Sequence, residues 1–565
     1  MVDKGLDTAG TAAGVGIGPV DWTVITVYML GIVALGCFAG LLRRRKGAEG
    51  HGYFLAGKSL TWPVIGLALF ATNISTFHLV SLAQSGYDTG LAMGNFEWMA
   101  AFTLICLSLF FAPFYIRSKV ATLPDFLEKR YSRGCRDWFA VISILSAIFI
   151  HMGFTLYTGA KVLEGFTGLP QMWCIVVVAC LTGLYTIVGG LLAVVLTESI
   201  QTVVLVSGAA FITLVGYYKV GGWDALQSTL AADWPEHLTV LRDSGDYSDL
   251  PWYTVFLGYP VLGIWYWCTD QTIVQRVLGA RDENHARIGP LFAGFIKILP
   301  VFIFVLPGSI CLALIMQDKI PALPTTVIDG VEKPDTLATY SHMIIHLLPI
   351  GLRGIVAAAL LAALMSTVSG ALNSIATLFS YDLVKRWRPE VSDHTLVLVG
   401  RIVTAVAMVA AILWSPLLRH YEDIFKGVNQ MISYVAPPVT ALFVWGVFWR
   451  RASGTAALAT AWAGTAMGLG CFCFEWNNGF TWLKESYGIQ IPFLMVAVYL
   501  FVACSVVLVV VSLFKPARHS PESEALVWKN PLDALRGDSW HGIGNYRILA
   551  AVLFVAMAGL YWLFR

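Results

Sequence analysis

Long apolar runs recur along the whole chain and are separated by short polar segments. A helical span needs roughly 20 apolar residues to cross the bilayer core, so this pattern is typical of a polytopic membrane protein. About fourteen runs meet that length, and we expect each to form a membrane-spanning helix. The predicted spans are 21–42, 60–85, 93–116, 138–165, 171–188, 193–217, 251–275, 288–316, 351–384, 395–416, 422–449, 455–473, 491–514 and 547–564.

Composition agrees with this pattern and excludes other classes of protein. Of the 565 residues, 57% are hydrophobic and only 13% are charged, which is too apolar for an ordinary soluble protein. The net charge of +2 gives no sign of a nucleic-acid partner. Most of the ten cysteines lie inside apolar runs, so no disulfide framework is expected. Span 21–42 follows a polar tail, 1–20, and ends at "RRRK", so we expect a retained anchor rather than a cleaved signal.

Lysine and arginine predict the orientation of the spans. They concentrate in alternate loops, including Arg43–Lys46, Arg450–Arg451 and the segment 515–546. The positive-inside rule makes these loops cytoplasmic and the longer loops 219–250 and 318–345 extracellular. With an even number of spans, both termini are expected outside.

Two spans carry polar or helix-breaking residues at mid-membrane depth. Residues 70–75 read "FATNIS", and Thr72, Asn73 and Ser75 compete with the backbone for hydrogen bonds, so they can interrupt the helix. A continuous helix, with the hydroxyls bonded to the preceding turn, is the alternative. A second interruption is expected near Gly263, within "GYPVLGIWYWCTDQ". Two broken spans, five helices apart, indicate an inverted-repeat secondary transporter.

The ninth span places small and hydroxyl residues on one helical face, within "AALLAALMSTVSGALNS". Small residues also allow close helix packing, which is the alternative interpretation. Ser366 and Thr367 nevertheless offer adjacent hydroxyls, and unwound carbonyls from "FATNIS" would supply further oxygens. Neutral oxygens of this kind suit a hard monovalent cation such as sodium.

Three ionisable residues lie in or near the ends of apolar spans: Glu97, Glu198 and Lys297. Each either forms a structural ion pair, snorkels to the interface, or marks a polar cavity. His342 and His346 have a spacing that could bind a metal, but no third ligand is evident, so we expect no zinc site. The intramembrane acids and histidines form no nucleophile–base arrangement, so an enzyme is not expected.

Four stretches together resemble the solute:sodium symporter family, most closely its sodium/glucose cotransporter branch. They are "LFATNISTFHLVSLAQSGYDTGLAMGNFEW", "YTIVGGLLAVVLTESIQT", "IWYWCTDQTIVQRVLGAR" and "LMSTVSGALNSIATLFSYDL". The resemblance, from about Tyr53 to about Trp449, implies an all-α LeuT-type fold of two inverted five-helix repeats, 60–217 and 251–449. Span 21–42 would precede them, and three spans within 455–565 would follow.

The resemblance also implies sodium-coupled symport of a sugar across the plasma membrane, with sodium as the coupling ion and no organic cofactor. By matching motifs, sodium would be held by the carbonyls of Ala71, Ile74 and Ala363 and the hydroxyls of Ser366 and Thr367. A second sodium site at Glu198 and Ser369 is left open, because family members that couple two ions generally have Asp and Thr there.

The resemblance places a substrate cavity beside this site, with Tyr266 similar to the family's inner aromatic gate. In the eleventh span the branch usually has Gln, whereas this chain has Asn429 with Gln430 beside it. Gly263 stands where a Thr can contact sugar, which we expect to enlarge the cavity. The expected cavity residues are Asn73, His78, Phe96, Glu97, Tyr266, Trp267, Lys297, Phe425 and Asn429.

The substrate is therefore left open. A hexose such as glucose or galactose is the leading expectation, with inositol or another non-hexose solute as the first alternative. The second alternative is a sugar-gated sensor or a sodium leak channel that does not accumulate sugar.

Overall fold

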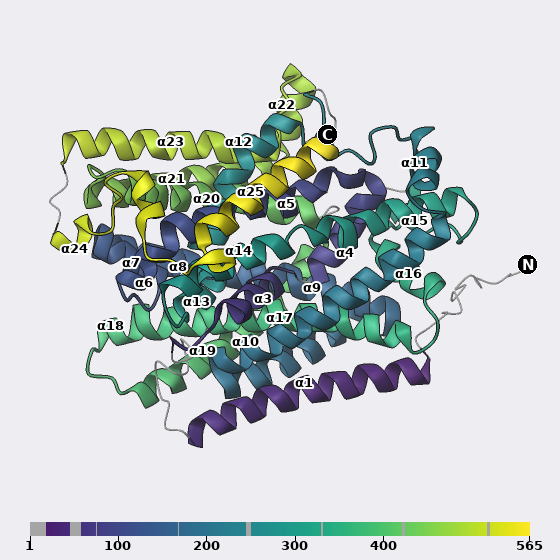
Figure 1. Cartoon of the computed structure of the whole chain (residues 1–565), viewed down its shortest axis with the longest axis horizontal. Coiled ribbons are helices and arrows are strands. Elements are labelled where there is room, and N and C mark those ends of the chain that lie inside the picture. The colour runs from purple at the N-terminus through teal and green to yellow at the C-terminus, as the bar shows by residue number, and fades with distance from the viewer. Residues whose placement is uncertain are drawn as a thin grey trace, which may run out of the picture.

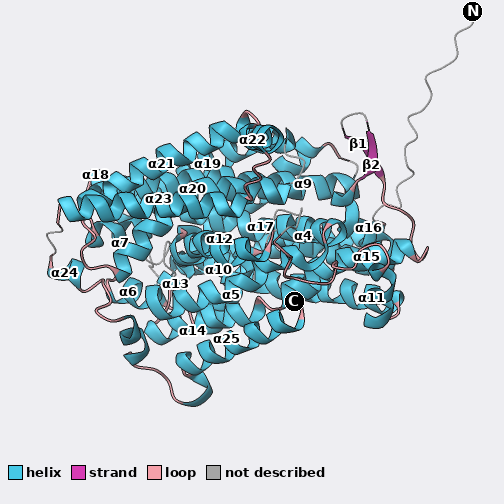
Figure 2. Ribbon diagram, turned by 90° about the horizontal axis from the view of Figure 1, so that it is seen from above, coloured by secondary structure: helices cyan, strands magenta, loops and turns pink. Residues whose placement is uncertain are grey.

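The computed structural model describes residues 18–45, 58–74, 76–167, 169–244, 250–328, 331–420, 424–516 and 520–565. Within these residues the chain is almost entirely helical, and most long helices run in the same general direction (Figure 1). Strands β1 (Thr325–Ile328) and β2 (Val331–Pro334) form an antiparallel hairpin at one edge of the helical bundle (Figure 2). The expected all-α architecture is confirmed.

The helices of the N-terminal half include short 3₁₀ and π segments, which join neighbouring α-helices into longer spans. They are α1 (Pro19–Arg45), α3 (Trp62–Asn73), α4 (Thr76–Asp88), η2 (Gly90–Gly94), α5 (Asn95–Cys106), η3 (Leu107–Phe111), α6 (Ala112–Arg117), α7 (Leu123–Arg130), α8 (Arg133–Ser146), η4 (Ala147–Met152), α9 (Gly153–Thr167), α10 (Gln171–Val220) and α11 (Trp223–Ala231).

The C-terminal half continues in the same way. Its helices are α12 (Trp252–Gly263), η5 (Ile264–Thr269), α13 (Gln271–Leu278), α14 (Glu283–Ile296), η6 (Val301–Val305), α15 (Leu306–Met316), η7 (Thr336–Ala338), α16 (Thr339–Leu347), α17 (Leu352–Leu378), η8 (Phe379–Val384), α18 (Lys385–Trp387), α19 (Asp393–Trp414), η9 (Ser415–His420), α20 (Ile424–Phe448), α21 (Gly454–Trp476), α22 (Gly479–Tyr487), α23 (Phe493–Phe514), α24 (Pro521–Glu524), η10 (Pro531–Arg536), η11 (Gly542–Gly544) and α25 (Tyr546–Leu563).

Among the described residues, 11 helices are long and apolar enough to cross a membrane, or 12 if the bent pair α3 and α4 counts as one span. The spans expected at 171–188 and 251–275 are not among them. The first corresponds to a shorter apolar stretch, Gln171–Leu184, and the second to α12 with η5. The structure also carries one helix, α10, through the loop that we expected between 188 and 193.

The expected break at "FATNIS" is confirmed. Helix α3 ends at Asn73, Ile74 has extended backbone angles (φ −78°, ψ 101°), and α4 leaves the break at an angle of 61°. The Thr72 hydroxyl donates to the carbonyl of Ala68, one turn earlier, over 2.8 Å, a bond that tends to weaken and bend a helix. The two half-helices therefore leave backbone oxygens at the break.

The second break lies at Asp270 rather than near Gly263. Helix α12 contains Pro260 and continues without interruption into the π-helix η5, up to Thr269. Asp270 is extended (φ −75°, ψ 125°), and its side chain caps α13 by accepting from the Thr272 amide over 2.7 Å. The break therefore coincides with the N-cap residue of the next helix, and Pro260 upstream does not interrupt α12.

The two breaks lie in the centre of the helical bundle. Helix α17 packs against α3, α10 and α1, whereas α14 packs against α3 and α5 (Figure 1). The N-terminus of α1 is tied to that of α17, because the Asp21 carboxylate accepts from the amides of Gly351 (2.7 Å) and Gly354 (2.8 Å). The half-helix α3 thus packs against α14, α10 and α17.

Candidate functional site

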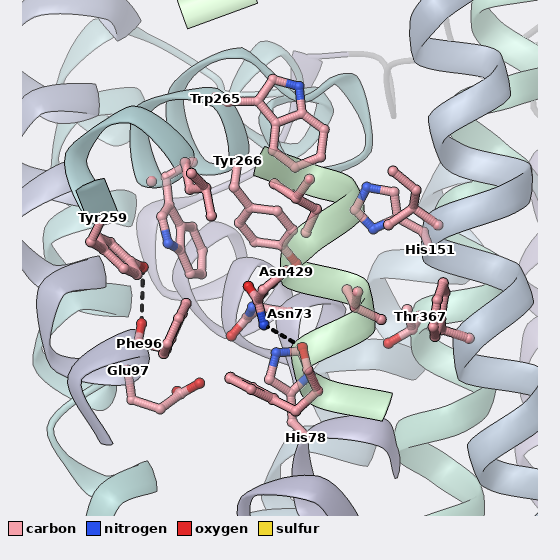
Figure 3. Close-up of a pocket in the computed structure, with 18 of the residues that line it drawn as sticks. Asn73, His78, Phe96, Glu97, His151, Tyr259, Trp265, Tyr266, Thr367 and Asn429 are labelled. Carbon is pink, nitrogen blue, oxygen red and sulfur yellow. Dashed lines mark hydrogen bonds between the residues drawn. The ribbon is translucent and has the colours of Figure 1, made fainter. Parts of the chain in front are cut away.

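A cavity of about 100 Å³ lies where the end of α3 faces η5 (Figure 3). Its wall comes from segments far apart in the chain and combines aromatic rings with a few polar groups. The lining residues are Asn73, His78, Phe96, Glu97, Ile150, His151, Phe154, Thr155, Tyr259, Leu262, Gly263, Trp265, Tyr266, Trp267, Thr367, Phe425, Val428, Asn429 and Ile432. Apolar walls with a few convergent polar groups are typical of small-molecule sites.

A buried polar network at the break joins four helical segments, α3, η5, α5 and the end of α14. The Asn73 amide donates to the Tyr266 hydroxyl over 3.2 Å (Figure 3), while the Asn73 carbonyl oxygen accepts from the ammonium of Lys297. The same ammonium pairs with the Glu97 carboxylate, and the two side chains are only 1% and 3% exposed. All four were expected to line the substrate cavity from the sequence; the structure brings them together, but Lys297 does not itself line the cavity.

Local structure explains why these charges can lie so deep. Glu97 lies in the first turn of α5, where the positive end of the helix dipole favours a carboxylate. Lys297 follows the last residue of α14, just before Pro300 opens the next segment. Its ammonium also lies 5.3 Å from the centre of the Trp267 ring, within the range of a cation–π contact. Each charge is thus compensated.

Aromatic contacts close one side of the cavity. The Phe96 ring meets the Phe425 ring edge to face, with 5.0 Å between centroids, and the Phe96 carbonyl accepts from the Tyr259 hydroxyl over 2.9 Å. His78, at the start of α4, also lines the cavity. The expected positions of Phe96, Phe425 and His78 in the cavity wall agree with the structure.

Asn429 rather than Gln430 faces the cavity. Asn429 is 8% exposed, lines the cavity, and donates its amide to the carbonyl of Phe425 over 2.9 Å. Gln430 lies on another face of α20, where its amide donates to the Glu475 carboxylate over 2.8 Å. The shorter amide is therefore the one available to a substrate.

Gly263 does line the cavity, but close packing accounts for its lack of a side chain. A Cβ atom at this position would lie 2.8 Å from the Thr103 methyl group and 2.6 Å from the Tyr259 ring. Contacts that short require a neighbour to move. The space beside Gly263 is thus taken by Thr103 and Tyr259, so the expected enlargement of the cavity on that side is wrong.

The hydroxyls of α17 reach the carbonyls at the end of α3. Ser366 donates to the Ala71 carbonyl over 3.0 Å, and Thr367 donates to the Thr72 carbonyl over 3.2 Å. Ala71 is buried at this junction, and so are Ile74 and Ala363. Because α3 ends here, its C-terminal carbonyls carry the negative end of the helix dipole. The junction gathers neutral oxygens that suit sodium, and it includes Thr72, which sequence reasoning did not assign to this site.

The second sodium position remains a prediction. Ser369 is buried and donates its hydroxyl to the Ser366 carbonyl over 2.9 Å, within the same helix. Glu198 lies on α10, but its side chain is outside the part that the structure describes. Among the described residues, no group of three or more His, Cys, Asp and Glu side chains could hold a metal ion.

Sequence reasoning missed a buried pair on the opposite wall. The His151 ring nitrogen Nε2 lies 3.1 Å from the Asp270 carboxylate, and the His151 ring lies against Trp265 and Tyr266. Figure 3 shows His151 across the cavity from Asn73 and Glu97. A lone histidine inside an apolar run was the available signal, because ionisable residues at membrane depth are rare.

Comparisons with known proteins agree with this geometry. The family model described as "Sodium:solute symporter family" matches residues 53–464. A sodium/mannose cotransporter of Bos taurus is 34% identical over 90% of this chain and 89% of its own length. A sodium/myo-inositol cotransporter of Mus musculus is 32% identical over 88% of this chain and 73% of its own.

A solved structure supports the fold. The substrate-bound, outward-open form of a Na⁺-coupled sialic acid symporter has 23% identical residues and a TM-score of 0.74, and covers 89% of this chain and 100% of its own. Together with the match along most of the sequence, this likeness shows what kind of protein the chain is. The chain belongs to the sodium:solute symporter family and is a multi-pass plasma-membrane transporter rather than an enzyme.

Proposed function

We propose that this transporter imports a sugar or polyol together with sodium, by alternating access. The proposal is carried by the cavity at the α3 break. Asn73, Glu97 and Asn429 supply donors and acceptors for hydroxyl groups, while Tyr266 and Trp267 supply aromatic faces for the less polar side of a ring. The Lys297 ammonium is already neutralised by Glu97, which favours an uncharged substrate over a carboxylate.

Sodium would bind at the junction of α3 and α17, through the carbonyls of Ala71, Ile74 and Ala363 and the hydroxyls of Ser366 and Thr367. This assignment is supported by the two hydroxyl–carbonyl hydrogen bonds that already join the helices. In the proposed cycle, sodium binds from outside and replaces these hydrogen bonds. It then holds α3 against α17 and favours the outward-open state.

Coupling follows from how close the two sites are. Thr72 faces the proposed sodium site through its carbonyl, and the next residue, Asn73, faces the substrate cavity. Thr367 contributes to both. Because coupling is a shared binding free energy, sodium must raise substrate affinity as much as substrate raises sodium affinity. A membrane potential of 100 mV adds about 2.3 kcal/mol of driving force for each sodium ion.

The proposed topology has fourteen spans, with both termini outside and the segment 515–546 in the cytoplasm. The repeats 60–217 and 251–449 would rock against each other. Two contacts support the proposal that the two ends of the chain lie on the same side of the membrane. Asp21 of α1 binds Gly351, just after the loop 318–345, and the Phe564 carbonyl accepts from Val240 in the loop 219–250 over 2.8 Å.

Uptake into proteoliposomes tests the proposal. Purified protein would be given radiolabelled hexoses, pentoses, inositols and sialic acid, with an inward sodium gradient or an equal potassium gradient. We expect sodium-dependent accumulation of at least one neutral polyhydroxylated solute, and none of sialic acid. If no solute accumulates with sodium, the symport proposal is wrong, and a solute-evoked current without accumulation would indicate a channel or sensor instead.

A further inference from the structure

A second cavity, of about 360 Å³, lies between α8 with η4, the end of α19, α20 and α21, and we call it the lateral cavity. No charged residue lines it. The Trp138 indole donates to the Thr465 hydroxyl over 3.0 Å, and that hydroxyl donates to the Ala461 carbonyl over 2.8 Å. The hydroxyls of Ser146 and Tyr434 are buried in the wall. The surface offered to an occupant is therefore almost wholly apolar.

Part of the wall of the lateral cavity lies on the exposed surface of two candidate membrane spans. Two of its lining residues, Leu145 and Leu469, are 44% and 59% exposed, and each belongs to a candidate membrane span, Arg133–Glu164 or Gly454–Trp476. Exposed apolar side chains in the middle of a membrane span face the hydrocarbon of the lipid tails. The molecules that reach this opening are thus the lipids themselves.

The lateral cavity also adjoins the substrate cavity. Ile150, in η4, lines both of them and is 6% exposed. Helix α20 also contributes to both cavities. Ile432 lines the substrate cavity, and Val435 lines the lateral cavity. An occupant of the lateral cavity would lie against the back of the substrate-cavity wall.

We propose that an acyl chain of a bilayer phospholipid occupies the lateral cavity and packs against Ile150. The volume lies within the usual range of small-molecule pockets, about 300–1,000 Å³. An unfilled cavity of this size would leave its apolar wall without packing partners, and a lipid tail supplies them without burying a polar group. This inference concerns lipid binding and stands apart from the choice of transported solute.

Photolabelling tests the proposal without a transport assay. The protein would be reconstituted with phosphatidylcholine that carries a diazirine near the middle of one acyl chain, then irradiated, digested and mapped by mass spectrometry. We expect labelled peptides from the walls of the cavity, 138–150 and 431–438. Val435→Phe places a ring in the cavity and narrows it beside α20, and should reduce this labelling at least fivefold. Val406→Phe is the matched control, because Val406 is 63% exposed on α19 and does not line the cavity.

Leu469→Trp narrows the opening from α21 and serves as a second variant if Val435→Phe does not fold. Either variant should lower labelling of 138–150 while leaving labelling of α23 and α25 unchanged. The proposal would be overturned by labelling that is spread over the exposed apolar side chains of all the helices, or by labelling of 138–150 that is as strong in both variants as in the unaltered protein.

Discussion

The ammonium of Lys297 is paired with the carboxylate of Glu97 at a depth where both side chains are almost completely buried. Removing one member of such a pair leaves an uncompensated charge and typically costs about 3–5 kcal/mol. We therefore expect Lys297→Met and Glu97→Gln each to lower the free energy of unfolding by roughly that amount. Thermal unfolding of the purified protein measures this.

The double variant Lys297→Met/Glu97→Gln separates stability from transport. With both charges gone, no unpaired ion is left, so we expect most of the stability to return while substrate uptake stays low. A double variant whose loss of stability equals the sum of the two single losses would show that the two residues do not act as a pair. Full substrate uptake by the double variant would show that neither Lys297 nor Glu97 takes part in substrate binding.

Ser366→Ala and Thr367→Ala are expected to weaken sodium dependence. Each removes an oxygen from the junction between α3 and α17, where the hydroxyls contact the carbonyls of Ala71 and Thr72. We expect the sodium concentration for half-maximal uptake to rise about tenfold, which corresponds to about 1.4 kcal/mol. Thr404→Ala is the control, because that hydroxyl donates to the carbonyl of Gly400 in its own helix, α19, and belongs to neither proposed sodium site. An unchanged sodium dependence in Thr367→Ala would refute the proposed placement.

Asn429→Gln is expected to change substrate choice rather than sodium dependence. The longer side chain enters a cavity of only about 100 Å³, so the rank order of accepted sugars and polyols should change. A screen of sodium-dependent uptake across hexoses and inositols measures this. Gln430→Ala is the matched control, because Gln430 contacts Glu475 outside the cavity. An equal change in both variants would mean that the effect is not local to the cavity.

Asp270 has two roles that substitutions can separate. It accepts from the Thr272 amide as the N-cap of α13, and its other carboxylate oxygen contacts His151 in the cavity wall. Asp270→Asn keeps a capping oxygen but loses the charge, so we expect near-normal thermal stability with reduced uptake. Asp270→Ala also loses the cap and should cost about 1 kcal/mol more. If Asp270→Asn and Asp270→Ala lower thermal stability equally, the N-cap of α13 contributes nothing measurable to the stability of the protein.

His237 predicts a pH dependence of stability outside the membrane spans. It follows α11, and its ring nitrogen Nε2 lies 2.9 Å from the Gly86 carbonyl; burial lowers the pKa of His237 to about 4. The unfolded chain, with a histidine pKa near 6.5, therefore binds a proton first as the pH falls. We expect the free energy of unfolding to fall by roughly 1 kcal/mol per pH unit between about pH 6.5 and 4.

Thermal unfolding at pH 7.5, 6 and 5 would check this. In His237→Gln, which keeps an amide donor for the Gly86 carbonyl but cannot titrate, the slope should be smaller. The same slope in the variant and in the unaltered protein would assign the effect to other groups.

The sequence by itself determined the membrane class of the chain, most of its spans and the break at "FATNIS". These are local properties: the length of an apolar run decides whether it can span a bilayer, and Thr72 and Asn73 perturb the helix in which they lie. Charged residues at depth also stand out locally, so Glu97 and Lys297 could be recognised as candidates without any knowledge of what they contact.

Only the tertiary structure decided which polar groups meet. The pairing of His151 with Asp270, the contact of Thr367 with Thr72, and the choice of Asn429 over Gln430 depend on how helices far apart in the sequence are rotated and packed. A helix presents a different face every residue, so rotation by about 100° exchanges one neighbouring side chain for the next. No local pattern records that rotation, because it is set by close packing against the other helices.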